Sequence, residues 1–384
     1  MNNSFKNFAI ACISVLSLMV VFSFTVKNQS TTKELLIKYD STIKDYTPVV
    51  FEAIKKLKSE GYNKIVFEKG EYHFYPEKAF EKYTAISNHD NGLRKTAFPI
   101  LNLNHIEIDG GSSEFLFHGK IIPITIENAS NITIKNLSID WPRTFNSEME
   151  VVAVNNENKT VDFAISEDYP YQIRNQQLVF VNKYYSHSLE MGIYFNPKTN
   201  AVVYNSVKYP SYKVFDGKFQ TFNPKPEEDI NEEFITIPAN NVKPLNITAQ
   251  EIKPGLVRLK SINGDLPEVG WFYVAKGYNS ENRLVPAVRI YSSLNIAVEN
   301  VNVYHAGGMG LIAEKCTNIN LDKFNVRLRE GTKRHLSTTA DATHFVNCKG
   351  LVKIENCLFE NQLDDATNIH GTYVEVTKVI NNKT

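Results

Sequence analysis

The chain has 384 residues, of which 42% are hydrophobic and 22% are charged, a composition that is ordinary for folded globular proteins and excludes intrinsic disorder. Its 42 Lys and Arg residues balance 42 Asp and Glu residues. No basic field therefore exists to attract phosphates, and nucleic acid is not expected as a partner. At roughly 150 residues per domain, this length allows two or three domains.

The first 27 residues predict an export signal, because Lys6 precedes an uncharged, largely apolar run of 19 residues from Phe8 to Val26. A run of this length suits either a cleaved signal peptide or a signal anchor that stays in the bilayer. We therefore expect an exported protein, whether periplasmic, at the cell surface or extracellular. It would meet a membrane only through this segment, if the segment is not removed.

Residues 28–145 are expected to form an N-terminal cap and the first turns of a β-rich fold. A proline in the first turn, apolar residues at helical spacing and a glycine past the end predict a short capping helix over 47–61. Alternating residues at 65–67 and 71–74 predict two strands about a tight turn. From there the chain is expected to continue in strands.

One pattern, apolar-x-apolar-x-x-apolar-x-apolar, recurs along the chain. Looser copies begin at Ile106 and Val374, and steps of about 22 to 26 residues recur, from 106 to 132, from 296 to 319 and from 352 to 374. An Asn, or in one copy Lys323, stands before the third apolar residue. The clear copies are Ile132, Ile134, Leu137, Ile139; Ile296, Val298, Val301, Val303; Ile319, Leu321, Phe324, Val326; and Val352, Ile354, Cys357, Phe359.

Two short strands with a bend between them, repeated at this period, are typical of one coil of a parallel β-helix. Stacked coils place equivalent positions about 4.8 Å apart and align their inward Ile, Val and Leu side chains into a continuous core. Leucine-rich repeats share the period, but their Leu/Asn consensus is missing, and a β-sandwich is the structural alternative. We predict an all-β protein built on a right-handed parallel β-helix.

The coils are expected to be interrupted by a second domain. Between the copies at Ile132 and Ile296 lie 164 residues, where one coil needs about 24. Residues 146–280 are rich in short alternating strands and in proline, which predicts a small inserted β-barrel or sandwich. The coils resume over 281–384. No capping segment follows the last copy, so we expect the protein to continue beyond residue 384.

The four cysteines, Cys12, Cys316, Cys348 and Cys357, form no C-x-x-C pair, which argues against zinc or thioredoxin-like chemistry. Cys12 lies in the leader. The other three are unusual in an exported protein, because exported thiols are normally oxidised. We interpret them as buried and unpaired, and we expect no metal or other cofactor.

The strongest chemical signal is a local duplication of acidic residues. Asp341 stands in Ala-Asp-Ala-Thr-His344, and the motif returns 24 residues later as Asp364-Asp365-Ala-Thr-Asn368. One coil separates the copies, so we expect Asp365 over Asp341, Asp364 beside them, and His344 over Asn368. Hydrolases use such neighbouring carboxyls in acid and base roles. The alternative is that these aspartates cap turns or bind calcium.

Other groups could complete a polar cleft around these carboxyls. Arg289 and His305 are candidates, and Trp141 could stack on a sugar face, although core packing is the commoner role of tryptophan. The Gly307-Gly308 pair is more typical of a bend than of a phosphate cradle, since no G-x-x-x-x-G-K motif is present. The absence of G-x-S-x-G and H-E-x-x-H motifs excludes serine hydrolases and zincins.

The segments 339–350 and 364–371 resemble glycoside hydrolase family 110. The likeness extends over about residues 45–384 and includes the motifs at 117–120 and 139–141. Members of this family are inverting α-1,3-galactosidases, some of which remove the terminal galactose of blood-group B antigens. They fold as a β-helix with inserted β-barrel domains and are substantially longer than this chain.

By this resemblance the chain is expected to be an exo-acting glycosidase that removes terminal α-1,3-linked galactose from an oligosaccharide or glycoconjugate. Asp341, Asp364 and Asp365 match active-site carboxyls, with Asp364 or Asp365 as the general base. The side chains expected to hold the galactose are His305, Arg289, His344, His370 and Trp141.

The position of the general acid can also be predicted. An inverting glycosidase holds its acid and base about 6.5 to 9.5 Å apart, which is between one and two coils of about 4.8 Å. One coil past Asp365 falls near position 389, so we expect the acid to lie past Thr384 and these residues alone not to hydrolyse normally. The alternatives are a polygalacturonase-like β-helix hydrolase and a non-catalytic glycan-binding surface solenoid. The neutral charge fits the former less well, because its substrate is polyanionic.

Overall fold

The computed structural model describes residues 32–190, 192–209, 215–216, 243–244, 247–260, 262, 264–277, 283–372 and 381. The predicted leader and the faint repeat at Val374 lie outside these residues. Residues 34–384 form one compact unit. Within the described part of the chain, no helix is long and apolar enough to cross a bilayer.

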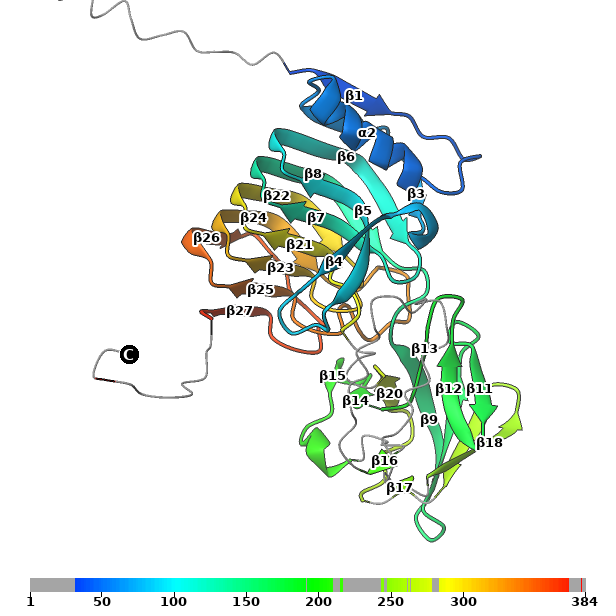
Figure 1. Cartoon of the computed structure of the whole chain (residues 1–384). Coiled ribbons are helices and arrows are strands. Elements are labelled where there is room, and N and C mark those ends of the chain that lie inside the picture. Colours follow the sequence, from blue (N-terminus) through cyan, green and yellow to red (C-terminus); the bar gives the residue numbers. More distant parts are fainter. Residues whose placement is uncertain are drawn as a thin grey trace, which may run out of the picture. The chain divides into compact units, whose positions relative to one another are not determined.

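Two sheets of stacked strands dominate the fold (Figure 1). The first has the order β1 (Glu34–Ile37), β2 (Lys64–Phe67), β6 (Asn104–Phe117), β8 (Ser130–Asp140), β22 (Leu294–Val303), β24 (Thr317–Val326) and β26 (Lys349–Glu355), with β3 (Glu71–Phe74) also paired to β6. The second has the order β27 (Thr367–His370), β25 (Thr343–Val346), β23 (Leu311–Glu314), β21 (Val288–Tyr291), β7 (Ile122–Glu127), β5 (Gly92–Leu101) and β4 (Phe80–Thr84).

The chain alternates between these sheets, so that each coil contributes one strand to each. The coils are β5–β6, β7–β8, β21–β22, β23–β24 and β25–β26. Strands of consecutive coils pair in parallel, and only the edge pair β4–β5 is antiparallel among the described strands of the two sheets. This arrangement confirms the predicted parallel β-helix.

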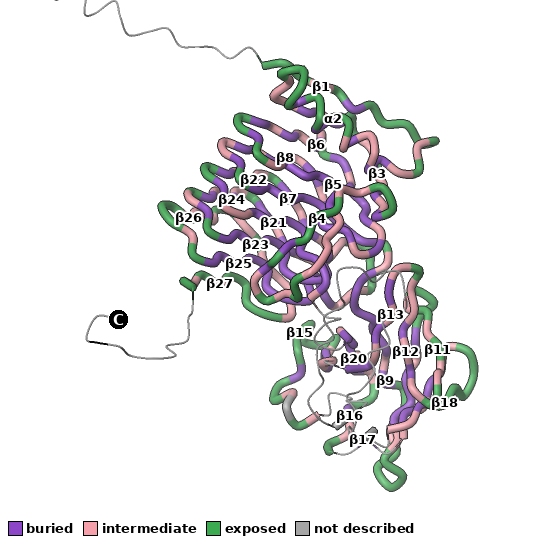
Figure 2. Tube along the Cα trace, viewed as in Figure 1, coloured by how far each residue is buried: buried purple, intermediate pink, exposed green. Residues whose placement is uncertain are grey.

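The apolar pattern found in the sequence is the ladder of the first sheet. Ile132 pairs with Ile296, and Ile296 with Ile319, and the other three positions of the pattern follow in the same register. These side chains are at most 3% exposed and lie along the buried interior shown in Figure 2. Because each coil can bury its apolar row only against its neighbours, the pattern has to repeat.

Asparagines at the bends allow the coils to turn. Asn131, Asn295 and Asn318 all have a positive φ of 55 to 59°, a conformation that Asn tolerates better than most residues. Their side chains also bond along the stack: Asn295 Nδ2 donates to Asn131 Oδ1 at 3.0 Å, and Asn318 Nδ2 donates to Asn295 Oδ1 at 2.9 Å. Asn136 and Asn300, before the third apolar position, repeat this arrangement.

The first coil carries the predicted helix and one correction. α2 (Thr47–Ser59) begins at the predicted threonine with proline in its first turn, and it buries Val50, Ile54 and Leu57 against the end of the stack. The strands predicted at 65–67 and 71–74 form, but they do not pair with each other. Both instead pair in parallel with β6, because the turn between them is a corner of a coil. A 3₁₀ turn, η1 (Pro76–Lys78), follows.

The inserted segment builds sheets of its own between β8 and β21. They are β15 (Ala201–Val202), β14 (Ile193–Asn196), β20 (Phe272–Ala275), β9 (Ser147–Asn155), β10 (Thr160–Ile165), β19 (Leu256–Lys260) and β18 (Thr248–Lys253); then β11 (Tyr171–Arg174), β12 (Gln177–Val181) and β13 (Ser186–His187); and β16 (Phe215–Asp216) with β17 (Lys243–Pro244). A 3₁₀ turn, η2 (Ser206–Lys208), follows β15. Neighbouring strands within these sheets pair antiparallel around a separate apolar core, so the predicted inserted β domain is present.

Contacts from the inserted segment reach the coil between β24 and β25. The Nδ1 of His335 lies 2.6 Å from Glu148 Oε2, and the ring of Phe272 lies 4.2 Å from that of His335. Leu336 is fully buried against Phe195 and Val274. These contacts fix the path of the chain that leads into β25.

The connections that leave the first sheet and enter the second all lie at one corner of the coils. This corner holds the short turn at 118–121, the inserted segment after β8, the glycine-rich turn at 304–310, the connection 327–342 and the connection 356–366. Because the strands of consecutive coils are in register, residues far apart in sequence are brought together there.

We predict that the left-handed bend, more than the amide ladder, makes Asn295 important for stability. Asn295→Ala should lower the free energy of unfolding by about 1–2 kcal/mol, because alanine is strained at a positive φ, where its Cβ comes too close to the following carbonyl oxygen. Asn295→Gly, which loses the same amide bonds but tolerates the bend, should cost clearly less. Urea unfolding midpoints at constant m-value would measure both, and equal losses for the two variants would contradict this account.

Candidate active site

The three predicted carboxyls lie at this corner, on the coils that lead into β25 and β27. Thr343 pairs with Thr367 and His344 with Asn368, which is the register predicted from the sequence. The N–H of Ala342 donates to the carbonyl oxygen of Asp365 at 2.9 Å. Asp341 and Asp365 therefore occupy equivalent places on adjacent coils, about 4.8 Å apart along the stack.

Asp341 is buried and held by a histidine. It is 3% exposed, and its Oδ2 lies 2.5 Å from Nδ1 of His344, which is itself 1% exposed. The Nε2 of His344 lies 2.9 Å from Nε2 of His370, and Nδ1 of His370 lies 2.6 Å from the carbonyl oxygen of Gly371. The two predicted histidines thus extend a hydrogen-bonded chain from Asp341, which fixes the direction of its carboxyl.

Asp364 is exposed and paired with a cation. Its Oδ2 lies 2.7 Å from Nη2 of Arg283. Lys276, on the strand end that leaves the inserted domain, donates to the carbonyl oxygen of Thr339 at 3.4 Å. Burial, together with the charge of Arg283, lowers the pKa of Lys276, whereas Asp364 acts in the opposite direction. Two cations that follow the inserted domain therefore border the carboxyls.

Asp365 is exposed as well, but its side chain has a neutral partner. Its Oδ2 accepts a hydrogen bond from Nδ2 of Asn368 at 3.1 Å. No cation lies within ion-pair distance of Asp365 among the described residues. The three carboxyls thus differ in environment: one is buried beside a histidine, one is paired with arginine, and one is open to solvent.

A histidine from the first coils also reaches the corner. His89, in the turn between β4 and β5, lies against Gly308, where an added Cβ would come within 2.5 Å of its Nε2. Its Nδ1 donates to the carbonyl oxygen of Ser87, and its Nε2 is buried without a polar partner among the described residues. Burial above all, assisted by the charges of Arg94 and Arg283, lowers the pKa of His89 to about 4, so this ring is neutral at pH 7.

The glycine-rich turn serves close packing. A Cβ on Gly307 would meet the ring of Phe145 at 2.6 Å, and one on Gly310 would meet the carbonyl oxygen of Ala342 at 2.6 Å. Neither has a positive φ. Glycine is therefore required at this turn because other parts of the chain approach it closely, in keeping with the predicted bend.

Arg289 lies on the same sheet as His344, but its side chain contacts other residues than the three predicted carboxyls. It pairs in the ladder with Ile312, which pairs with His344, so it lies two coils from that histidine. Its guanidinium is buried, with Nη1 3.0 Å from Glu127 Oε2 and Nη2 3.4 Å from the carbonyl oxygen of Ala85. The structure does not bring Arg289 into contact with the carboxyls.

His305 and Trp141 are enclosed in the core. The Nε2 of His305 accepts the N–H of Phe145 at 2.9 Å, and Nδ1 donates to the carbonyl oxygen of Ser337 at 2.6 Å. Burial above all, with the charge of Arg334, holds the pKa of His305 well below its usual value. Trp141 is 0% exposed and donates to the carbonyl oxygen of Gly119 at 3.1 Å. Neither presents a free surface to a sugar, so we assign both to packing of the corner.

Three groups at this corner were missed from the sequence: His89, Lys276 and Arg283. Nothing in their local sequence separates them from ordinary surface residues, because only the folded chain brings His89 against Gly308 and the two cations near Asp364. The two cations had one available signal, since they stand where the inserted segment returns to the stack. Among the described residues, no three His, Cys, Asp or Glu side chains gather as a metal ligand set would.

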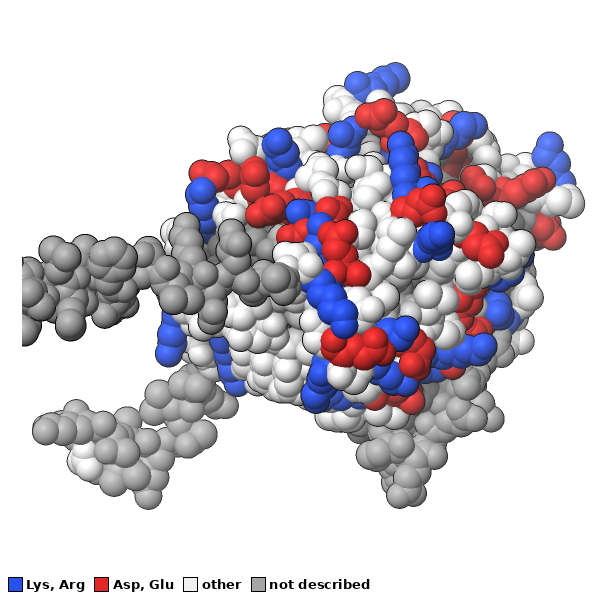
Figure 3. Space-filling view, turned by 90° about the horizontal axis from the view of Figure 1, so that it is seen from above, with Lys and Arg blue, Asp and Glu red and all other residues white. Residues whose placement is uncertain are grey.

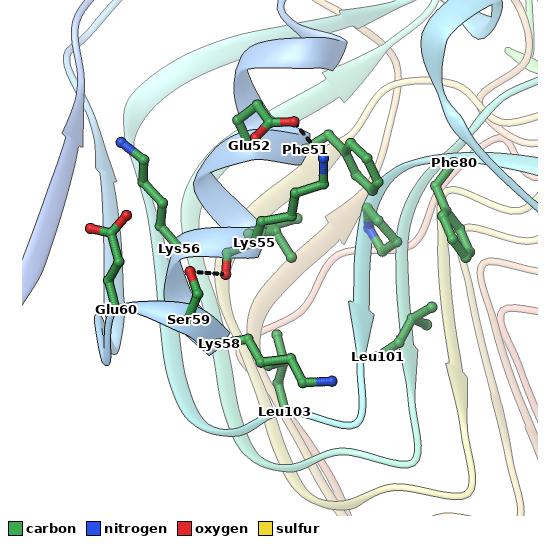
Figure 4. Close-up of a pocket in the computed structure, with 12 residues that line it drawn as sticks. Phe51, Glu52, Lys55, Lys56, Lys58, Ser59, Glu60, Phe80, Leu101 and Leu103 are labelled. Carbon is green, nitrogen blue, oxygen red and sulfur yellow. Dashed lines mark hydrogen bonds and ion pairs between the residues drawn. The ribbon is translucent and has the colours of Figure 1, made fainter.

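Other surfaces are less suited to catalysis. A groove of about 550 Å³ opens between α2 and β5 (Figure 4), lined by Phe51, Phe80 and Leu101 together with helix lysines. It lies at the β5 end of the second sheet, far along the strand order from β25 and β27, and its Glu52 is paired with Lys55 at 2.6 Å. Figure 3 shows acidic and basic side chains mixed over one face of the molecule.

Comparison with known proteins identifies the chemistry of the relatives. Residues 147–272 match the family described as GLAA-B beta-barrel domain I. The chain is 33% identical over 340 residues to alpha-1,3-galactosidase A of Shewanella woodyi, covering 88% of this chain and 50% of that protein. It is 31% identical over 389 residues to alpha-1,3-galactosidase B of Phocaeicola vulgatus, covering 97% of this chain and 58% of that protein.

The chain thus spans about half the length of these curated relatives. Among solved structures, a putative glycosyl hydrolase from Parabacteroides merdae aligns with 86% of this chain and 96% of its own, at 11% identity and a TM-score of 0.32. That structural likeness is too weak to support an argument. The resemblance indicated by the motifs is nevertheless confirmed by sequence: over most of its length the chain is a homologue of the α-1,3-galactosidases A and B, and it fits glycoside hydrolase family 110.

Proposed function

We propose that the corner formed by the coils of Asp341 and Asp365 is the galactose-binding and hydrolytic site of an exo-acting α-1,3-galactosidase. The observation that carries this proposal is the presence of carboxyls on adjacent coils in different environments. Such a difference allows chemically identical groups to take different roles in one reaction. The names of the relatives supply the linkage and the sugar.

Asp365 suits the general base in this mechanism. A base must accept a proton from the attacking water, and Asp365 is exposed with only a neutral amide as its partner. Asp364, by contrast, is held in an ion pair with Arg283, so one of its oxygens is engaged by a guanidinium instead of being open to a water. Water activated by Asp365 would attack the anomeric carbon opposite the leaving oxygen and invert the configuration.

Asp341 suits the binding of galactose hydroxyls. His344 fixes one of its oxygens, which leaves the carboxyl with a defined direction at a place one coil from the base. The backbones of Asp341 and Asp365 lie about 4.8 Å apart along the stack, a shorter spacing than the 6.5 to 9.5 Å that separates acid from base in inverting enzymes. We therefore keep the prediction that the acid comes from another coil, on the far side of Asp365.

The substrate and the location follow from the same proposal. The ligand would be a galactose-terminated oligosaccharide or glycoconjugate, which lies outside cells or in the periplasm in most settings, and residues 1–27 would export the protein to meet it. A polygalacturonase-like activity is less well supported, because the relatives are named as galactosidases and the chain has no net positive charge.

We predict that Asp365→Asn removes the base without removing the sugar site. The rate is measured on an aryl α-galactoside with a good leaving group, because the general acid is expected outside these residues. The variant should hydrolyse it about 10²- to 10⁴-fold more slowly, while its affinity for galactose, measured by calorimetry, stays within a few-fold. Reactions with the protein in excess over the substrate would detect slow turnover. NMR of the first product should show β-galactose from the unmodified chain.

The matched control is Asp265→Asn, which changes an exposed aspartate in the inserted domain. Turnover that is equal in the two variants would remove Asp365 from the base role. Galactose binding without any product, even from an aryl galactoside that needs no general acid, would instead support a glycan-binding solenoid.

A further prediction concerns His344, which we propose positions Asp341. His344→Leu should reduce kcat by roughly 10- to 100-fold, because small misplacements of a positioned group have effects of that size, and His344→Gln should lose less. In an Asp341→Asn background, His344→Leu should cause no additional loss of kcat.

Melting temperatures of all four variants would show whether they are folded. Additive losses in the double variant would show that His344 acts independently of Asp341. If Asp341→Asn recovers its rate on an aryl galactoside with a good leaving group, Asp341 is the general acid instead of a binding residue.

A further inference from the structure

Two cysteines lie opposite each other on consecutive coils, at the corner that leads from the second sheet to the first. Cys316 follows Lys315, which has a φ of 54°, and Cys348 follows Asn347, which has a φ of 52°. One coil earlier, Ser292 has the same left-handed conformation and comes directly before Ser293. The two cysteines are therefore at equivalent positions in a column of small side chains.

The backbone register places the two cysteines within reach of a disulfide. On one side of the pair, the N–H of Lys315 donates to the carbonyl oxygen of Val346 at 2.9 Å. On the other side, the N–H of Lys349 donates to the carbonyl oxygen of Cys316 at 2.8 Å. Thr317 also pairs with Lys349 in the ladder. Adjacent rungs are about 4.8 Å apart, inside the 4.4 to 6.8 Å between Cα atoms that a disulfide requires.

Each thiol donates to a backbone carbonyl: Cys316 Sγ lies 3.2 Å from the oxygen of Glu314, and Cys348 Sγ lies 3.4 Å from that of Ala313. The interaction between the two thiols lowers the pKa of Cys348 to about 7 and, together with burial, raises the pKa of Cys316. Cys316 is 0% exposed, whereas Cys348 is partly exposed. Cys348 is thus the thiol that an external reagent can reach and the one that ionises near neutral pH.

We propose that Cys316 and Cys348 are an oxidative modification site, at which an external disulfide oxidant forms an intrachain disulfide across two consecutive coils. The Cys348 thiolate attacks one sulfur of the oxidant and releases one thiol, which leaves a mixed disulfide on Cys348. Cys316 then loses its proton, its sulfur attacks that of Cys348, and the second thiol leaves. The oxidant gains two electrons and two protons, and the two protein thiols lose the same two electrons and two protons.

The bond would stabilise the coil that carries the candidate site. It closes a loop of 31 intervening residues that includes Asp341 and His344, and a loop closed by a covalent bond loses entropy in the unfolded chain. The proposal does not depend on the galactosidase assignment, because it rests on the ladder alone. In an oxidising compartment the disulfide would be the expected state.

The test uses the whole chain, purified reduced and then incubated with oxidised glutathione. We expect the native protein to lose two titratable thiols and two mass units, and peptide mapping to find Cys316 joined to Cys348. The melting temperature should rise by several degrees and fall back on reduction. Cys357→Ser is the matched control, since Cys357 stands opposite Phe324 two residues before the Val326–Phe359 bridge, and it should behave like the unmodified chain.

Variants of the pair separate the two steps. Cys316→Ser should accumulate a stable glutathione adduct on Cys348, because nothing can displace it, and Cys348→Ser should form neither the adduct at that position nor the bridge. Retention of both thiols in the folded protein, or a bridge that forms only after denaturation, would overturn the proposal. A bond between Cys348 and Cys357 would do the same.

Discussion

The rest of this structure depends on the backbone hydrogen bonds between consecutive coils. They hold each residue of one coil opposite its equivalent in the next, and they do so even between β8 and β22, where 164 residues separate Ile132 from Ile296. The apolar ladder makes this register favourable, because a slip by one residue would turn the inward side chains of a strand outward. The asparagines with positive φ supply the bends that let the chain return to the same place on every turn.

This register explains how a site can form from segments that share no local signal. Asp341 and Asp365 lie on adjacent coils, His89 arrives from the first coils, and Arg283 arrives from the far end of an inserted domain. Each stands at the corner where the first sheet passes into the second. Insertions at that corner leave the ladders intact, so the stack can carry a second domain and a polar site at the same edge. The carboxyls of Asp341 and Asp365 are chemically identical and differ only in their surroundings, since Asp341 is buried against His344 and Asp365 is exposed.

Much of the fold could be predicted from the sequence because the apolar pattern is itself the structural constraint. The four clear repeats are in the predicted register, and counting one coil between Asp341 and Asp365 placed His344 opposite Asn368. The strands at 65–67 and 71–74 were harder to interpret, since a short turn looks the same in a hairpin and at a corner of a coil. Burial was not predictable for single side chains: Trp141 and His305 lie on segments that border the corner, yet both pack inside it. Arg283 and Lys276 were missed because their proximity to Asp364 arises only when the inserted domain returns to the stack.

The central claim is that carboxyls of neighbouring coils surround one sugar. A crystal structure of the chain soaked with galactose tests it most directly. The account predicts one galactose at the corner, with its ring hydroxyls within hydrogen-bond distance of Asp341 and its anomeric carbon facing Asp365. A galactose held only in the groove between α2 and β5, or one that leaves Asp341 and Asp365 without contact, would contradict it.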